Sequence, residues 1–423
     1  MSRLGIGLVG CGGMAHSVHL PAIAALKDRL ELVAVCDRDL ARAEVAAGEY
    51  GGRAYSDLDK MLAEARGLDI VAVVVHAQHH HSVAIRAAEA GKHVIVEKPL
   101  ALTVPCADAM LDACKRNNVK LEVAENYFRM PMDALINQAA RSGVLGPTRT
   151  VHVLDPVNGC SLDIGVHRYS QLREAAGGWP TSITAYSSPP PIPECQRPEG
   201  AEAWLEEREF GDWRGREWSV AMVTFDNGVL GKCEHFPLGR EAPVWCGNLR
   251  MIVGDAGAIC DDLWPNVWPW LPRGRVTTKR WGGHTGHQEI PIRRTEETLF
   301  GKPFAVRIEL GSTPPVVWEN PVADVLRRSA RGTVKETGHE NKATWPDWFV
   351  AELTAYHTFA NAVMEDAAQQ YGGPKGRNDV ELTIATYESA RTGTAITLPL
   401  ESITEHEEAI HEAFERRYGR PIL

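Results

Sequence analysis

The stretch from Leu4 to Asp37 reads LGIGLVGCGGMAHSVHLPAIAALKDRLELVAVCD. Its order is an apolar strand, a glycine turn, a helix and a second strand that ends in an acid. Gly10 permits a tight turn, Gly12 lets the backbone approach a pyrophosphate, and Ala15 lets the helix pack closely on the strand. N–H groups at the start of the helix would face the phosphates, and Asp37 can accept hydrogen bonds from the adenosine ribose. The stretch therefore predicts a dinucleotide-binding unit.

Composition limits the class of protein. The 423 residues suffice for two or three domains. A net charge of −10 without any block of Lys or Arg argues against a nucleic-acid partner or an anionic membrane surface. Nine scattered cysteines fit no disulfide framework and indicate a reducing compartment. The first strand leaves no room for a leader, and no apolar run could span a bilayer. We therefore expect a cytoplasmic protein.

The pattern of apolar residues changes along the chain. Residues 1–125 alternate short Val/Ile-rich strands with helices, which is typical of a doubly wound parallel sheet covered on both faces. From about Pro147 longer strands follow, with Asp226-Asn227-Gly228 as a hairpin turn. We expect a dinucleotide-binding domain at 1–125 and a second domain at 126–423. Within the second domain, residues from about 264 to 344 have weak periodicity and predict a loop-rich insertion.

Glu97-Lys98-Pro99 lies at the C-terminal end of the predicted strand His93–Glu97. Ligands of an open parallel sheet lie outside the carboxyl ends of its strands, so Lys98 is expected beside the reactive half of the cofactor. A lysine there can hold a hydroxyl oxygen and ease its deprotonation. The alternative is a surface lysine that precedes a turn proline.

Asp163-Ile164-Gly165-Val166-His167 opens a predicted helix. Asp163 and His167 lie four positions apart and therefore on one helical face, and Gly165 between them is expected to leave room for a ligand. Histidine is suited to accept a hydroxyl proton near neutral pH. The alternative is an acidic residue at a helix start followed by a core histidine.

Four motifs together closely resemble the Gfo/Idh/MocA family of oxidoreductases (glucose–fructose oxidoreductase, inositol dehydrogenase and rhizopine catabolism). They are GCGGMA with His19-Leu20-Pro21, AGKHVIVEKPLA, Asn126-Tyr127-Phe128-Arg129, and LDIGVH. The resemblance implies an α/β protein: an N-terminal Rossmann domain and a C-terminal α/β domain with a large open, mostly antiparallel sheet. It also implies oxidation or reduction of sugars and cyclitols with NAD or NADP.

The resemblance also implies roles for single residues. Lys98 would steer the reacting hydroxyl and the cofactor, His167 would accept the proton, and Asp163 would position substrate or relay the proton. Substrate contacts would come from Lys98, Tyr127, Arg129, Asp163 and His167. The expected cofactor contacts are Gly10, Gly12, Gly13, Met14, Asp37, Arg38, Val75, His76, His80, Glu97, Lys98 and Asn126.

The chain departs from the family pattern at three places. Val75-His76 stands where the family often has Thr-Pro, Ser170 replaces a frequent Asp, and the single helix-start histidine becomes His79-His80-His81, of which His80 matches. Neighbouring histidines at a helix start point in different directions, and His284 and His287 have no nearby carboxylate or Cys partner, so we expect no metal.

All twelve tryptophans lie between Trp179 and Trp348. Trp245, Trp264, Trp268, Trp270 and Trp281 fall where the family builds its substrate wall and subunit contacts. Flat apolar rings suit stacking on a sugar, although each one could simply pack a core.

The sequence thus predicts an enzyme that moves hydride between nicotinamide and a secondary alcohol carbon of a sugar, glycoside or cyclitol. Asp37 favours NAD, while Arg38 leaves NADP possible. Two alternatives stay open: a redox-neutral NAD-dependent glycosidase that acts by transient oxidation and elimination, and a non-catalytic nucleotide-sensing regulator. Because strands near Glu217–Phe236 carry apolar residues on both faces, a homodimer or homotetramer is expected.

Overall fold

The computed structural model describes residues 3–155, 160–188, 218–236, 249–262, 275–278, 288–299, 301–329 and 346–423. The chain forms two compact units, each built from three separate stretches of sequence. Unit 1 comprises Met1–Pro131, Glu296–Val306 and Asn320–Arg377, and unit 2 comprises Met132–Thr295, Arg307–Glu319 and Asn378–Leu423.

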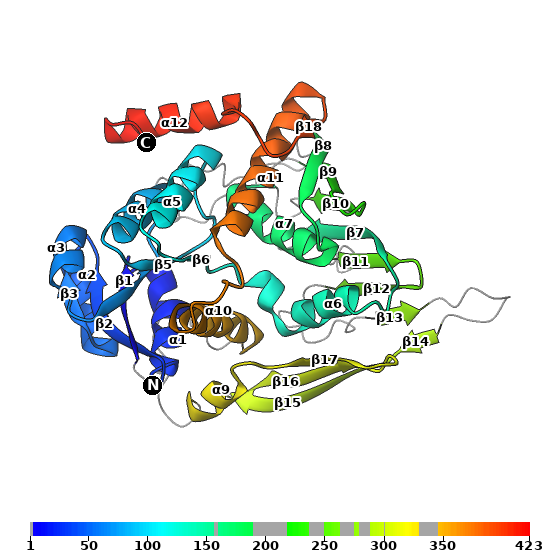
Figure 1. The fold of residues 1–423 in the computed structure, drawn as a ribbon, viewed down its shortest axis with the longest axis horizontal. Coiled ribbons are helices and arrows are strands. Elements are labelled where there is room, and N and C mark those ends of the chain that lie inside the picture. Colours follow the sequence, from blue (N-terminus) through cyan, green and yellow to red (C-terminus); the bar gives the residue numbers. More distant parts are fainter. Residues whose placement is uncertain are drawn as a thin grey trace, which may run out of the picture. The chain divides into compact units, whose positions relative to one another are not determined.

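Unit 1 contains a six-stranded parallel sheet in the order β3-β2-β1-β4-β5-β6 (Figure 1). Its central strands are continuous apolar runs whose side chains are buried, as expected for a sheet covered on both faces. The strands are β1 (Leu4–Val9), β2 (Leu30–Cys36), β3 (Arg53–Tyr55), β4 (Leu68–Val73), β5 (His93–Val96) and β6 (Leu121–Val123). The predicted Rossmann architecture is confirmed.

Short helices connect these strands, and several begin at the capping residues expected of them. Asp39 and Asp57 each accept a hydrogen bond from a backbone N–H in the first turn of the following helix. The connecting helices are η1 (Ala15–His19), α1 (Leu20–Ala25), α2 (Leu40–Tyr50), α3 (Leu58–Glu64), η2 (Ala77–His79), α4 (His80–Glu89) and α5 (Val104–Arg116), and η3 (Tyr127–Arg129) follows β6.

Unit 1 is completed by a helix from much later in the chain. Helix α10 (Pro346–Met364) packs against α1, η1, η3 and β5. Every residue from Phe349 to Tyr356 is buried, so the helix is covered on nearly all sides. The last part of unit 1 also includes α9 (Ala323–Ser329) and the first turn of α11 (Gly373–Thr392).

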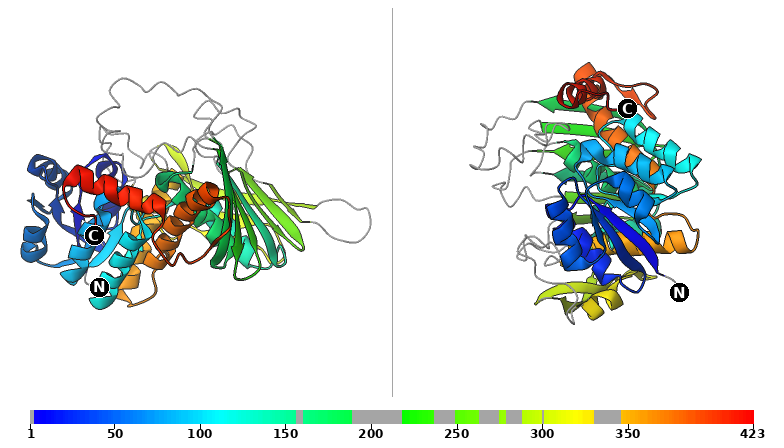
Figure 2. Two further views of the ribbon diagram at one scale, coloured as in Figure 1. Left: turned by 90° about the horizontal axis from the view of Figure 1, so that it is seen from above. Right: turned by 90° about the vertical axis from the view of Figure 1, so that its left-hand side faces the viewer.

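Unit 2 contains a nine-stranded sheet in the order β14-β13-β12-β11-β7-β10-β9-β8-β18. All of its pairings are antiparallel except the parallel pair β7 and β10, so the predicted open, mostly antiparallel sheet is confirmed. Figure 2 shows the green strands of this sheet side by side. The strands of the sheet are β7 (Thr148–Asp155), β8 (Pro180–Ser188), β9 (Trp218–Phe225), β10 (Leu230–His235), β11 (Leu249–Gly254), β12 (Gly257–Asp262), β13 (Arg275–Thr278), β14 (Gln288–Ile290) and β18 (Ile396–Thr397).

The predicted hairpin at Asp226-Asn227-Gly228 joins β9 and β10. The Gly228 N–H donates to the Phe225 carbonyl at 3.0 Å, and Gly228 adopts a φ of 83°, which glycine tolerates. Helix α7 (Leu162–Ala176) packs on β7 and β10. Helices α6 (Pro131–Arg141) and α12 (Glu405–Tyr418) complete the described helices.

The region predicted as a loop-rich insertion differs from that expectation where the structure describes it. It contains β13 to β17 and α9, and a three-stranded sheet has the order β15-β16-β17. The bounds of its strands are β15 (Ile292–Leu299), β16 (Lys302–Leu310) and β17 (Val316–Glu319). In β15, IRRTEETL, polar residues occupy nearly every position, so no alternation of apolar residues indicates a strand.

Candidate functional site

The glycine turn after β1 leaves room for a ligand. Gly10 has a φ of 98°, and a Cβ there would lie 2.5 Å from the Val74 carbonyl oxygen, so only glycine fits. At Gly12 and Gly13 an added Cβ would meet no atom within 4 Å. Open space beside a backbone turn that leads into the helical segment at Ala15 suits a pyrophosphate.

Asp37 lies directly after β2 and contacts the same turn. Its Oδ2 accepts a hydrogen bond from the Cys11 N–H at 2.8 Å, and its Oδ1 accepts one from the Asp39 N–H at 2.9 Å. A carboxylate has further acceptor sites beyond these two bonds. Asp37 therefore orders the glycine turn and keeps acceptor capacity for a ribose hydroxyl. Arg38 beside it is exposed.

His80 supports the loops that follow β4 and β5. Its Nδ1 lies 2.7 Å from the Pro99 carbonyl oxygen and its Nε2 lies 3.0 Å from the Val75 carbonyl oxygen. The side chain is buried, and burial lowers the pKa of His80 although both carbonyls oppose the change. The ring thus joins two strand ends expected to face the cofactor, while His76 is exposed nearby.

Glu97 and Lys98 follow β5 at the carboxyl edge of the sheet. Glu97 Oε1 lies 2.7 Å from His19 Nε2, and Oε2 accepts the Lys98 backbone N–H at 2.9 Å. Burial would raise the pKa of the Glu97 carboxyl, but the hydrogen bond and charge of His19 and the charge of Lys98 outweigh burial and lower it to about 2. Glu97 is therefore ionised, and Lys98 is half-buried beside it.

Asn126 follows β6 at the same edge. The amide oxygen of Asn126 is buried and accepts no hydrogen bond from the described residues. A buried acceptor normally has a donor, so this atom fits a ligand hydroxyl or amide. Tyr127 lies in η3 with its ring edge-on to Trp348, at a centroid distance of 5.5 Å. The open glycine turn, Asp37 and Asn126 together fit a bound dinucleotide.

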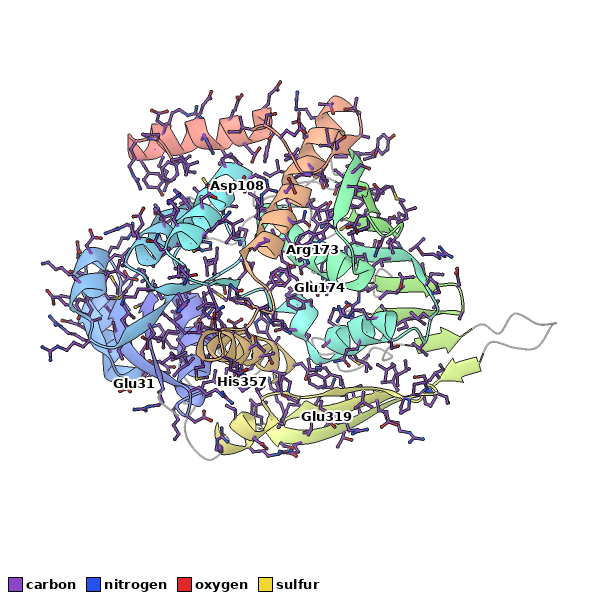
Figure 3. All side chains as sticks on the ribbon, in the orientation of Figure 1. Glu31, Asp108, Arg173, Glu174, Glu319 and His357 are labelled. Atoms are coloured by element: carbon purple, nitrogen blue, oxygen red, sulfur yellow. The ribbon has the colours of Figure 1, made fainter. Side chains whose placement is uncertain are left out.

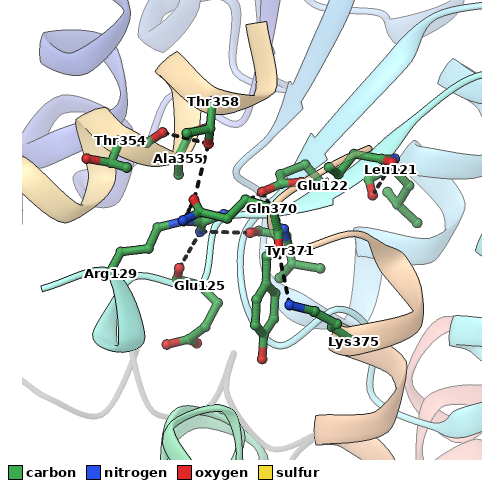
Figure 4. A network of polar contacts seen from close by, with 12 residues as sticks. Leu121, Glu122, Glu125, Arg129, Thr354, Ala355, Thr358, Gln370, Tyr371 and Lys375 are labelled. Carbon is green, nitrogen blue, oxygen red and sulfur yellow. Dashed lines mark hydrogen bonds and ion pairs between the residues drawn. The ribbon is translucent and has the colours of Figure 1, made fainter. Parts of the chain in front are cut away.

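Arg129, an expected substrate contact, lies instead in a buried network (Figure 4). Its Nε donates to Gln370 Oε1 at 2.8 Å, and Nη1 donates to the carbonyls of Val123 and Glu125. Its Nη2 forms an ion pair with Glu122 in which both side chains are fully buried. The guanidinium is thus committed within unit 1 and ties the end of β6 to the segment before α11.

Glu122 also accepts the Tyr371 N–H at 3.0 Å. Burial raises the pKa of the Glu122 carboxyl to about 7, against the lowering effect of Arg129 and the Tyr371 N–H. The Arg129 guanidinium carbon lies 4.8 Å from the centre of the Phe128 ring and 5.8 Å from that of Tyr371. These contacts indicate that Arg129 has a structural role in unit 1.

In unit 2, helix α7 presents the other predicted site residues. Ser161 caps its start by accepting a hydrogen bond from the Ile164 N–H, and His167 is buried while Asp163 is partly exposed. The expectation that Gly165 leaves space for a ligand is wrong. A Cβ at Gly165 would lie 3.0 Å from Thr383 Oγ1, so this glycine permits close packing of α11 on α7.

Two buried ion pairs fix α7 within unit 2. Arg168 Nη2 lies 2.8 Å from Asp155 Oδ2, and Arg173 Nη2 lies 3.3 Å from Asp379 Oδ1. Figure 3 labels Arg173 and Glu174 on this helix. Ser170, which replaces a frequent family Asp, donates to the His167 carbonyl at 2.8 Å. The position of His167 is therefore set by the packing of the whole helix.

Other predicted features fall outside the described residues: Trp245, Trp264, Trp268, Trp270, Trp281, His284 and His287. In the part of the chain that the structure describes, no group of three His, Cys, Asp or Glu side chains could hold a metal ion. No described helix is long and apolar enough to cross a membrane.

One group of contacts could not be predicted. His19 contacts Tyr356 and Glu352 of α10 as well as Glu97. His19 belongs to a motif that supports the family resemblance, but the sequence assigned it no role. No local pattern could reveal a partner 337 positions away.

The parallel sheet, the open glycine turn and the acid after β2 define a Rossmann protein of the dinucleotide-binding class. Residues 4–125 match the Gfo/Idh/MocA family model, described as the oxidoreductase family with an NAD-binding Rossmann fold. The resemblance predicted from the sequence is confirmed, and this part of the chain is an NAD-binding Rossmann fold of that family.

Two curated relatives are dehydrogenases. D-apiose dehydrogenase of Paraburkholderia graminis is 39% identical over 140 residues, which cover 33% of this chain and 36% of that protein. D-glucoside 3-dehydrogenase of Escherichia coli is 33% identical over 146 residues, which cover 34% of this chain and 41% of that protein. The chain therefore spans less than half the length of these two relatives.

Similarity to solved structures extends over nearly the whole chain. The WlbA dehydrogenase of Bordetella pertussis, solved in complex with NADH and UDP-GlcNAcA, superposes with a TM-score of 0.64 at 21% identity. The match covers 95% of this chain and 99% of that chain. It shows that the fold of both units is shared.

Proposed function

We propose that this protein is an NAD-dependent oxidoreductase acting on a secondary alcohol of a sugar, glycoside or cyclitol. The observation that carries the proposal is Lys98 at the carboxyl edge of an NAD-binding Rossmann sheet, held there by an ionised, buried Glu97. The printed activities of the relatives, D-apiose dehydrogenase and D-glucoside 3-dehydrogenase, support a carbohydrate substrate.

Several residues would hold the cofactor. The turn of Gly12, Gly13 and Met14 would take the pyrophosphate, Asp37 the adenosine ribose, and Asn126 a donor at the nicotinamide end. Bound NAD would supply a hydride acceptor. Because Asp37 would repel a 2′-phosphate, NAD is expected to bind more tightly than NADP.

Residues of this chain would transfer the proton of the substrate hydroxyl. Lys98 donates a hydrogen bond to the reacting hydroxyl oxygen and stabilises the negative charge that develops there. His167 accepts the hydroxyl proton, with Asp163 beside it to orient substrate. Oxidation should be slow in acid, because a protonated imidazole cannot accept a proton.

A screen of sugars, glycosides and cyclitols tests the proposal, with NADH formation followed by absorbance and products by chromatography. Lys98→Met and His167→Ala should each lower the rate by about 10²–10⁴. Lys92→Met, at the opposite end of β5, is the matched control and should keep the wild-type rate. Release of an aglycone without NADH accumulation would identify the redox-neutral glycosidase instead. Tight NAD binding without turnover of any substrate would favour the regulator.

We also propose that the protein assembles as a homodimer or homotetramer through the sheet of unit 2. In β8, β9 and β10, one set of alternate side chains is buried and the opposite set is partly exposed. The partly exposed set includes Tyr186, Val220, Met222 and Leu230. The same face also carries polar side chains such as Thr184, Thr224 and Lys232, and a face that mixes exposed apolar and polar groups suits a subunit interface.

A further inference from the structure

A buried histidine connects the end of β5 with helix α10. His19 Nε2 lies 2.7 Å from Glu97 Oε1, and Nδ1 lies 2.8 Å from the Tyr356 hydroxyl and 3.3 Å from Glu352 Oε1. His19 is 1% exposed, Tyr356 1% and Glu352 0%. All four residues belong to unit 1.

The roles of the ring nitrogens follow from their partners. An ionised carboxylate only accepts hydrogen bonds, so Nε2 carries the hydrogen in the contact with Glu97. Nδ1 faces a hydroxyl that can donate or accept, and a second carboxylate. The ring is therefore fixed in orientation by α10.

The contact reaches Lys98 through Glu97. One Glu97 oxygen meets His19, and the other accepts the Lys98 backbone N–H at 2.9 Å. Without His19, the Glu97 oxygen that faces it would be buried without its donor, and the Glu97 carboxylate would lose the group that offsets its charge. This loss would alter both the backbone anchor and the charge beside the Lys98 ammonium group.

We propose that His19 is a positioning residue for Lys98, and that Glu352 and Tyr356 of α10 hold its ring in place. His19 and its partners on α10 set the position of Glu97, and Glu97 in turn sets the position of the Lys98 backbone and the charge beside the Lys98 ammonium group. The catalytic consequence rests on the proposed function, in which Lys98 contacts the reacting hydroxyl. The effect of His19 on the position and charge environment of Lys98 does not rest on the proposed function and is tested separately.

The first experiment examines the hydrogen bond itself in the full-length protein. A ring proton in a short, charge-assisted bond to a carboxylate gives a strongly deshielded proton NMR signal. We expect such a signal in the wild type, its loss in His19→Leu, and its retention in His357→Leu. His357 follows Tyr356 in the sequence of α10 and is labelled in Figure 3. Burial lowers the pKa of His357, and the charged groups that affect this pKa are Arg29 and Asp28. Absence of the signal from the wild type, or its persistence in His19→Leu, overturns the proposed contact.

The second experiment measures Lys98 directly, by mass spectrometry of its acetylation rate at fixed pH. In His19→Leu, the Glu97 charge is no longer offset and stabilises the Lys98 ammonium form. We expect acetylation of Lys98 to slow by about threefold or more, and His19→Gln, whose amide can donate to Glu97, to restore most of the rate. An unchanged rate in His19→Leu contradicts the proposal. If His19→Leu does not fold, Tyr356→Phe takes its place. This substitution removes one contact of the His19 ring and must also slow the acetylation of Lys98.

The third experiment adds turnover once a substrate is known. His19→Leu should lower kcat by about tenfold or more while the KM for NAD changes by less than about threefold, and His19→Gln should recover most of kcat. A wild-type kcat in folded His19→Leu overturns the positioning role. Absence of turnover in the wild type counts against the proposed function alone, because the NMR and acetylation results still decide the inference.

Discussion

The Asp37 carboxylate accepts a hydrogen bond from the Cys11 backbone N–H at 2.8 Å. The residue expected to bind the cofactor ribose therefore also holds the turn expected to bind the pyrophosphate. Ligand binding and the shape of the turn depend on the same side chain. Substitution of Asp37 therefore removes the acceptor for the ribose hydroxyl and also relaxes the turn.

Asp37→Ala should weaken NAD binding by about 1.5–3 kcal/mol, the usual cost of losing a charged hydrogen-bond acceptor. Isothermal titration calorimetry measures the change. Asp39→Ala is the control, because Asp39 caps α2 by accepting the Ala41 N–H and should affect stability only. Tighter binding of NADP than NAD by the wild type would show that Asp37 does not face the ribose.

Arg129→Met should lower the free energy of unfolding by about 3–5 kcal/mol, because it leaves the fully buried Glu122 without its ion-pair partner. Urea unfolding followed by circular dichroism measures this value. Arg116→Met, at an exposed position of α5, should change stability little. If Arg129 instead contacts substrate, the variant will keep its stability and lose substrate affinity.

Gly165→Ala should destabilise the protein by about 1–3 kcal/mol, since the new methyl group meets Thr383 at 3.0 Å. Combining it with Thr383→Ala should recover part of the loss. Gly48→Ala is the matched control. Gly48 lies in α2 with open space around its added Cβ, so alanine there should stabilise by about 0.5–1 kcal/mol. Equal effects of the two single substitutions would exclude the Thr383 contact as the cause.

Glu97 should make the folded state sensitive to acid. Its pKa is depressed from 4.5 to about 2, so the ionised form stabilises the fold above the unfolded pKa, and this contribution is lost as the pH falls from about 4.5 toward 2. The full contribution is about 2–4 kcal/mol. The difference in unfolding free energy between wild type and Glu97→Gln should therefore shrink between about pH 5 and pH 3. The exposed Glu89→Gln should show no such trend, and a constant difference for Glu97→Gln would refute the depressed pKa.

Tyr186→Glu should disrupt the proposed assembly, because Tyr186 is 69% exposed on β8 and a buried charge at an interface is costly. Sedimentation analysis should show smaller species than the wild type. Val45→Glu is a control at a hydrophobic position of α2 that is 61% exposed, and it should leave the assembly intact. A monomeric wild type at micromolar concentration would contradict the proposal.

The Rossmann part of unit 1 could be predicted closely because local signals agree there. The alternation of strands and helices predicted for residues 1–125 is present from β1 to β6. Strand β3 is only three residues long, Arg53–Tyr55, and was too short to be recognised by its pattern. The sheet of unit 2 was anticipated through the family resemblance and long alternating strands.

The roles of individual side chains were harder to predict. Arg129 follows the end of β6, where a substrate contact is reasonable, yet its partner Gln370 lies 241 positions away and takes the guanidinium into the interior. Gly165 lies between two candidate site residues, yet Thr383 occupies the space beside it. Such contacts depend on which distant helix packs against a segment, which periodicity alone does not specify.

The distance in sequence between His19 and α10 has a consequence for biosynthesis. The segment up to residue 131 leaves the ribosome long before Glu352 and Tyr356 are made. Until then, His19 and Glu97 lack the helix that covers them, and the nascent Rossmann sheet stays incomplete on one side. Closing so long a loop is entropically costly and slows folding.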